Sequence, residues 1–176
     1  MSSYSVSIAD AQRLVPIDRR RLVRLARSIL EREGVARAEI SVAVVDDRQI
    51  HAVNRDFLKH DFPTDVISFL FDGQDAMGKR PAARRRGSGH ARRRAKSAVP
   101  RGRRGTGKKL DGEIVISAET ALRVARELNA DPADELALYL VHGLLHLCGY
   151  DDLTPKEKRL MRRREADALW ESRRET

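Results

Sequence analysis

The sequence predicts a single α+β domain with four short strands and about five helices. Three observations predict it. The chain has 176 residues, a length that suits one domain with a hydrophobic core. Short segments rich in β-branched residues are interspersed with longer segments of helical periodicity. One basic segment, about residues 73–109, interrupts this pattern and lacks the apolar residues that either kind of element needs.

Nine elements are expected. The strands cover residues 4–8, 40–45, 66–71 and 110–117, and the helices cover about residues 16–33, 47–57, 118–128, 133–148 and 155–174. The first strand alternates polar and apolar residues, as an edge strand does. The first helix places its apolar side chains on one face and ends at Gly34. A valine-rich strand follows, and Asp46 or Asp47 can cap the second helix. The third strand is entered through turn residues 63–65.

The second half of the chain has clear boundary signals. Ser117 closes the fourth strand and can cap the third helix. Asp131 is a cap, and Pro132 after it suits the first position of the fourth helix. That helix is apolar almost all round, so we expect it to be buried. Gly149 ends it, and the capping-box pattern of residues 154–157 opens the last helix.

Positive charge is concentrated in the basic insert. Residues 79–109 contain 14 Lys and Arg and no acidic residue, so they carry +14 within a net charge of +9, and the other 145 residues carry −5. The insert cannot bury enough apolar surface to fold, so we expect disorder. It is either a solvated loop or an arm that binds phosphates, because clustered arginines gain from counterion release. Its candidate nucleic-acid-binding residues are Arg84, Arg85, Arg86, Arg92, Arg93 and Arg94.

Several protein classes are excluded. The apolar runs are shorter than the roughly 18–20 residues that a membrane span needs. The first residues lack a basic head followed by an apolar stretch, so no signal peptide is expected. The single cysteine, Cys148, excludes an internal disulfide framework and fits a reducing compartment. We therefore expect a cytoplasmic protein without a membrane partner, and the oligomeric state stays open.

The candidate metal site lies in HGLLHLCGYDD, residues 142–152. His142 and His146 lie four residues apart on the fourth helix, so both imidazoles can converge on one point. Gly149 lets the chain reverse, so Asp152 can direct its carboxylate toward them. Two histidines and one carboxylate are typical of zinc sites that keep a fourth position for water. The alternative is a pair of core histidines, which is costly unless both rings find partners.

The residue after the first histidine argues against one class of enzyme. Zinc peptidases with the pattern H-E-x-x-H use the glutamate as a general base. This chain has Gly143 at that position. We therefore do not expect a peptidase with that mechanism.

The same segment resembles a known family. HGLLHLCGYDD is similar to H-G-x-L-H-L-x-G-Y-D-H, the signature of the YbeY family of bacterial metal-dependent endoribonucleases, which mature ribosomal RNA. Three further matches follow the family order: NRDFLKHDFPTDVISF at residues 54–69, GEIVIS at residues 112–117, and the pair Met161 and Glu165. Together they span about residues 40–165 except the insert. The resemblance implies a small mixed sheet with helices packed on it.

The resemblance also implies a zinc ion held by three histidines. Carried over by position, two of the ligands are His142 and His146. The third position falls on Asp152, where the family has histidine. Aspartate ligates zinc, but carboxylates favour harder ions, so another divalent metal is an alternative. Asp151 is a competing candidate for the third ligand, and no general base is identified.

A second departure from the family concerns RNA. Some members have an arginine just after the aromatic residue of the N-x-x-[YF] segment, and this chain has Leu58 there. Lys59 and His60 follow it. They are candidate nucleic-acid-binding residues, or else solvated loop residues.

Three functional hypotheses result. The leading one is a single-strand-specific, metal-dependent endoribonuclease that acts in late small-subunit rRNA maturation and ribosome quality control. Its partners would be ribosomal RNA and the small ribosomal subunit. The second is a non-catalytic ribosome-assembly or RNA-binding factor with a structural metal. The third is a metal-dependent hydrolase of another substrate.

Overall fold

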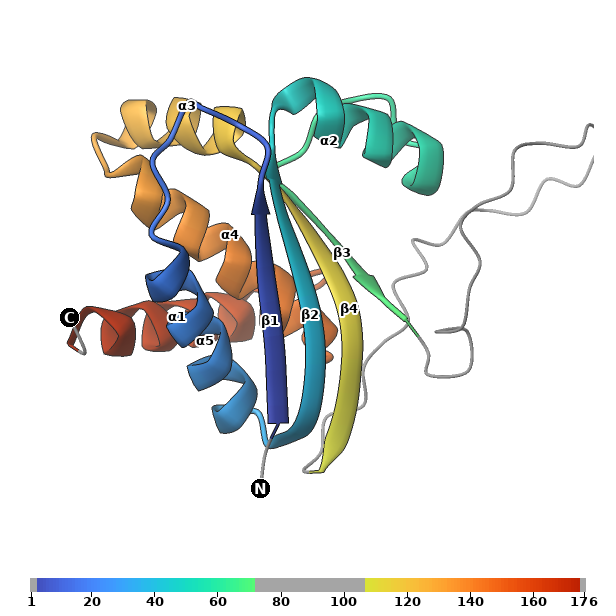
Figure 1. Cartoon of the computed structure of the whole chain (residues 1–176), viewed down its shortest axis with the longest axis vertical. Coiled ribbons are helices and arrows are strands. Elements are labelled where there is room, and N and C mark those ends of the chain that lie inside the picture. The colour runs from blue at the N-terminus through green and yellow to red at the C-terminus, as the bar shows by residue number, and fades with distance from the viewer. Residues whose placement is uncertain (1–2, 72–106, 175–176) are drawn as a thin grey trace, which may run out of the picture.

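The computed structural model describes residues 3–71 and 107–174 (Figure 1). Within these ranges it confirms the predicted α+β fold, with a four-stranded sheet and five α-helices. The strands are β1 (Ser3–Asp10), β2 (Val35–Val45), β3 (Val66–Leu70) and β4 (Lys108–Ser117). The helices are α1 (Arg19–Arg32), α2 (Asp47–Val53), α3 (Ala118–Leu128), α4 (Pro132–Leu147) and α5 (Pro155–Arg174), with a π-helical turn, η1 (Asn54–Leu58), after α2.

The sheet is mixed and has the order β1-β2-β4-β3. β1, β2 and β4 are parallel, and β3 runs antiparallel to β4. Helices α1 and α4 pack against the sheet, α1 on β1 and β2 and α4 on β3 and β4, while α5 packs against α1 and α4. Helices α2 and α3 lie at the end where β2 and β4 finish (Figure 1). The sheet therefore supports α4, the helix that contains both candidate histidines.

Helix α4 is the centre of the core, as its apolar sequence predicts. Its fully buried side chains include Leu136, Leu140, Leu144 and Leu147. A Cβ built on Gly143 would come within 2.9 Å of Ile114 Cγ2 and 3.3 Å of Val66 Cγ2. The glycine therefore allows a close approach of α4 to the sheet, and a glutamate at this position would have no room. Although α4 is apolar, no helix of the described ranges is long and apolar enough to cross a bilayer.

The predicted helix boundaries are confirmed where a local cap specifies them. Asp46, rather than Asp47, caps α2 by accepting a hydrogen bond from the Gln49 amide. Ser117 caps α3, Asp131 caps α4, and the Thr154–Glu157 capping box precedes α5.

Three strands are longer than predicted. β1 spans Ser3–Asp10 rather than residues 4–8. β2 begins at Val35, five residues early, because exposed Arg37 and Glu39 alternate with side chains that face the helices. β4 begins at Lys108, so Lys108 and Lys109 belong to the sheet and not to the insert.

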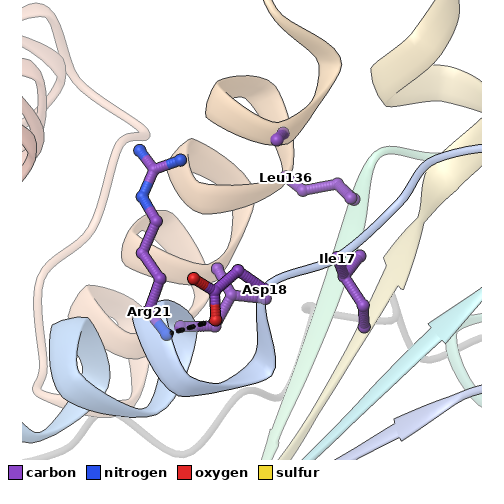
Figure 2. A pocket seen from close by; sticks show the side chains of 6 residues that line it. Ile17, Asp18, Arg21 and Leu136 are labelled. Atoms are coloured by element: carbon purple, nitrogen blue, oxygen red, sulfur yellow. Dashed lines mark hydrogen bonds between the residues drawn. The ribbon is translucent and has the colours of Figure 1, made fainter.

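A small hollow lies where α1 meets α4 (Figure 2). At its rim Asp18 caps α1 by accepting a hydrogen bond from the Arg21 amide at 2.9 Å. The Arg21 guanidinium forms an ion pair with Asp134 at 2.5 Å. The hollow has a volume of about 20 Å³, which is room for about one water molecule. It is too small to be a ligand site.

Candidate metal centre

The last two turns of α4 bring His142 and His146 together, as the four-residue spacing predicts. Their ring centroids are 4.5 Å apart, and the two Nε2 atoms approach to 2.9 Å. Gly149 then adopts a left-handed conformation, with φ of 95°, and turns the chain back over the end of the helix. This reversal positions the next residues beside the two rings.

The Nδ1 atom of each ring contacts an acceptor on the opposite side. His142 Nδ1 lies 2.7 Å from Glu165 Oε1 of α5, and His146 Nδ1 lies 3.1 Å from the carbonyl oxygen of Tyr150. A carbonyl oxygen or an ionised carboxylate can only accept a hydrogen bond. Each Nδ1 therefore carries a proton, which leaves the Nε2 lone pair of each neutral ring free.

Two lone pairs facing each other at 2.9 Å repel unless a positive charge lies between them. A proton or a metal ion can supply this charge. The third member of the group is Asp152, whose Oδ1 lies 4.0 Å from His146 Nε2. The ligand atoms of His142, His146 and Asp152, the histidine cluster, all lie within 4.8 Å of one another. The cluster therefore offers two nitrogen donors and one carboxylate oxygen to a single cation.

Asp151 has a different position from its neighbour. Its carboxylate accepts a hydrogen bond from the Asp152 amide at 2.8 Å and so shapes the turn after α4. Among the described residues, the group that could hold a metal contains Asp152 and not Asp151. Cys148 is also outside this group. It is completely buried, and burial raises the pKa of its thiol to about 12.

The electrostatics of the two rings differ. Burial acts to lower the pKa of His142, but the hydrogen bond and charge of Glu165, together with the charge of Asp152, outweigh it and raise that pKa. Burial and the neighbouring His142 lower the pKa of His146, although Asp152 opposes them. When the metal-free cluster takes up one proton beyond those on the two Nδ1 atoms, His142 is therefore expected to hold it. A bound metal would have to displace this additional proton.

An open pocket of about 270 Å³ borders the cluster. His142 and Asp152 form one wall, and the other wall belongs to α5. Four α5 residues line it: Lys158, Met161, Arg162 and Glu165. The cluster is thus accessible to a ligand larger than water.

Comparison with known proteins agrees with the motif and the geometry. A model of the family described as "Endoribonuclease YbeY" matches residues 7–172. This chain belongs to the endoribonuclease YbeY family. The Endoribonuclease YbeY of Syntrophotalea carbinolica is 34% identical over 164 residues, which are 92% of this chain and 91% of that protein. The Endoribonuclease YbeY of Rhodopirellula baltica is 36% identical over 139 residues, which are 78% of this chain but 55% of that longer protein.

One solved structure supports the fold alone. The solution structure of TM1509 from Thermotoga maritima has a TM-score of 0.53 and 21% sequence identity, and the match covers 96% of this chain and 89% of that one. Family membership supports an endoribonuclease role for this chain.

The candidate RNA-binding residues of the YbeY motif segment lie outside the histidine cluster. Lys59, at the end of η1, has a left-handed backbone with φ of 63°, and its ammonium donates to the Asp56 carbonyl at 2.9 Å. The His60 ring stacks on Phe62 with 5.4 Å between centroids. Both are exposed, so they are accessible to a ligand, and their role in RNA binding stays a prediction.

Of the remaining expectations about RNA binding, only the one at Leu58 falls on described residues. The six candidate arginines of the insert, Arg84, Arg85, Arg86, Arg92, Arg93 and Arg94, lie outside the described residues. Leu58, which occupies the position of an arginine in some YbeY proteins, packs against a small apolar group. Its buried members are Val45, Ile50, Ile67 and Val115.

The sequence pattern alone assigns no function to three residues beside the cluster. Glu165 was recognised only as part of a family pattern, yet it holds His142 in place. Lys158 and Arg162 belong to none of the motifs. Their spacing was the available signal, because residues 158, 161, 162 and 165 follow the three- and four-residue steps of one helical face.

Proposed function

We propose that this chain is a metal-dependent endoribonuclease that cleaves single-stranded RNA in late small-subunit rRNA maturation and in ribosome quality control. Family membership supports the RNA cleavage. The pair of Nε2 atoms that face each other, with an acceptor behind each ring and a carboxylate alongside, carries the metal dependence. A cation satisfies this arrangement more completely than any protein group in the described part of the chain.

His142, His146 and Asp152 would hold one zinc ion, with three protein ligands and room for water. At such a site a divalent metal polarises a phosphate oxygen and lowers the pKa of bound water. Glu165 and the Tyr150 carbonyl keep both rings in the tautomer that leaves Nε2 free. The charge of Asp152 makes manganese or magnesium an alternative to zinc.

The proposed partners are ribosomal RNA and the small ribosomal subunit. Lys59, His60 and the arginines of the insert would add affinity that does not depend on sequence. Contacts of cations with phosphates release counterions, so RNA binding should weaken steeply as salt increases.

One observation favours a second candidate, a ribosome-assembly factor with a structural metal and no nuclease activity. Leu58 replaces a family arginine and packs against an apolar group, so it contributes no charge to RNA. A factor of this kind would keep the metal and bind RNA without cleaving it.

The test compares two histidine substitutions in the full chain. We expect the wild type to hold about one metal ion and to cleave a single-stranded precursor rRNA. His146→Ala should reduce cleavage by more than about 100-fold, because loss even of outer partners of a metal site costs about 10–100-fold. His51→Ala is the matched control, since His51 pairs with Asp61 at 2.9 Å and is not part of the histidine cluster.

The outcomes separate the candidates. Loss of metal and of cleavage in His146→Ala, with both kept in His51→Ala, supports the nuclease. Bound metal without cleavage of any precursor RNA supports the assembly factor. Cleavage that survives His146→Ala and a chelator contradicts a metal-dependent nuclease and points to a contaminating enzyme.

A further inference from the structure

One face of α5 is directed at the pocket beside the histidine cluster. Lys158, Met161, Arg162 and Glu165 all line it, and their spacing of three and four residues places them on one helical stripe. Two of them fix the orientation of the stripe. Met161 is 2% exposed, and Glu165 contacts His142 Nδ1 at 2.7 Å. Lys158 and Arg162 are consequently held at the pocket by the packing of their own helix.

The two cations of this stripe are not engaged elsewhere. Both are exposed, and within residues 3–71 and 107–174 neither head group has an ion pair. Other arginines of the fold differ. Arg21 is paired with Asp134 at 2.5 Å, and Arg123 is paired with Asp47 at 3.3 Å. The charges of Lys158 and Arg162 are therefore available to a ligand in the pocket.

The chemistry of the pocket favours an anion with several oxygen atoms. A guanidinium donates two parallel hydrogen bonds to a phosphate, and an ammonium adds a point charge that adapts to its position. A metal ion on the opposite wall would add positive charge to the same space. The volume of about 270 Å³ is just below the usual range for small-molecule sites, so it suits one nucleotide unit of a longer strand.

We propose that Lys158 and Arg162 bind a backbone phosphate of the RNA strand in the pocket that the histidine cluster borders. This inference rests on the proposed function, because it takes RNA as the ligand. It assigns α5 a part in holding the substrate, separate from the metal ligands on α4 and from the basic insert. The two residues position the strand and do not take part in the chemical step.

The test uses two double variants with the same change in charge. The first is Lys158→Ala with Arg162→Ala. The matched control is Arg159→Ala with Arg163→Ala, since both residues are exposed, do not line the pocket and lie one position along the helix, about 100° away. The insert is present in both variants, so its contribution to RNA binding cancels. The probe is a fluorescent single-stranded RNA with 2′-O-methyl groups, titrated into the zinc-loaded full chain at several salt concentrations.

The pocket variant should bind the probe about tenfold more weakly than the control. Its slope of log K against log salt should fall by about 0.7, because both side chains contact the same phosphate and each phosphate contact on a single strand contributes about 0.7. Arg162→Lys should keep the slope and lose only part of the affinity. Both double variants should unfold at the temperature of the wild type, since all four side chains are exposed.

Equal affinity and equal slope in the two double variants would overturn the proposal, because bulk charge would then explain the effect. A wild type that does not bind the probe would overturn it as well. The proposed nuclease function fails separately. In one outcome the wild type binds the probe and the two double variants differ as expected, but the wild type cleaves no RNA. That result would support the phosphate site and contradict the proposed nuclease activity.

Discussion

The Asp47 cluster and the histidine cluster are both polar, both partly buried, and each connects several elements of the fold. The Asp47 cluster consists of Asp47, Ser117, Thr120 and Arg123. The Asp47 carboxylate accepts hydrogen bonds from the Ser117 and Thr120 hydroxyls and from the Arg123 guanidinium. Burial acts to raise the pKa of Asp47, but these donors outweigh it and lower that pKa. This cluster balances its own charge.

The histidine cluster has the opposite character. Its two Nε2 atoms face each other at 2.9 Å, with acceptors rather than donors around them. Burial and the repulsion of like charges oppose a state in which both rings are positively charged. Protein donors complete the first cluster, whereas the second is completed by a cation from outside.

The difference separates a structural polar cluster from a binding site. Buried polar groups are usually satisfied by the protein itself, as around Asp47, and such a cluster joins elements of the fold. A cluster that leaves converging lone pairs sacrifices stability for a ligand. The comparison therefore predicts that substitutions at the two places change different properties.

The largest expected effect is on zinc affinity, and it follows from a substitution of Glu165, which contacts His142. Glu165→Gln keeps an acceptor near His142 but removes the negative charge that favours its Nδ1 proton. We expect zinc affinity to fall by about 10–100-fold, the usual cost of losing an outer partner of a ligating histidine. Isothermal titration with zinc measures the change.

The control for this substitution is Asp167→Asn. Asp167 is an exposed acidic residue on the same helix, outside the cluster. An equal loss of affinity in both variants would mean that long-range charge, and not the 2.7 Å contact with His142, is responsible.

Contacts between residues that are far apart in the chain could not be predicted from the sequence. The contact of His142 with Glu165 is one example, because it joins residues 23 apart on two different helices. The caps at Ser117, Asp131 and Thr154 were predictable because each involves residues two or three positions apart. The pairing of His142 with His146 was predictable because helix geometry sets it. The Asp47–Ser117 contact, however, joins residues 70 apart in the chain, and no local pattern encodes it. Only the packing of α2 against the end of β4 brings them together.

The same limit applies to the sheet. The valine-rich end of β2 was predictable, but its first half contains Arg37 and Glu39, which are exposed on the uncovered face of the sheet. In the sequence, a segment with such charged residues has the composition of a loop. Pairing with β1 and β4 makes this segment a strand, and strand order is a property of the whole fold.

The second largest expected effect is a loss of stability when Asp47 is substituted. Asp47→Asn removes the charge that Arg123 and both hydroxyls stabilise, so we expect a loss of about 1–2 kcal/mol in the free energy of unfolding at pH 7. Zinc affinity should not change. Urea unfolding and zinc titration on the same preparation test both statements, and a variant that loses zinc but not stability would contradict the comparison.

The pH dependence of that loss has a definite sign. The pKa of Asp47 is lower in the folded state than its ordinary value of 3.8, so ionised Asp47 stabilises the fold above that value. This contribution disappears as the pH falls through the lowered pKa. The free energies of unfolding of the wild type and of Asp47→Asn should therefore converge as the pH falls. A constant difference between them from pH 7 to pH 2 would exclude a charge effect.

The smallest expected effect concerns which metal the histidine cluster prefers. Asp152→His restores the histidine that the YbeY signature has at this position. Imidazole favours zinc, and carboxylates favour harder ions, so the ratio of zinc to manganese affinity should rise by up to about tenfold. Competition titrations of the two metals measure this ratio, and Asp151→His is the control. Because Asp151 shapes the turn and is not part of the cluster, His at position 151 should leave the ratio unchanged. A larger shift at Asp151 than at Asp152 would mean that the bound metal reorganises the turn and exchanges the two carboxylates.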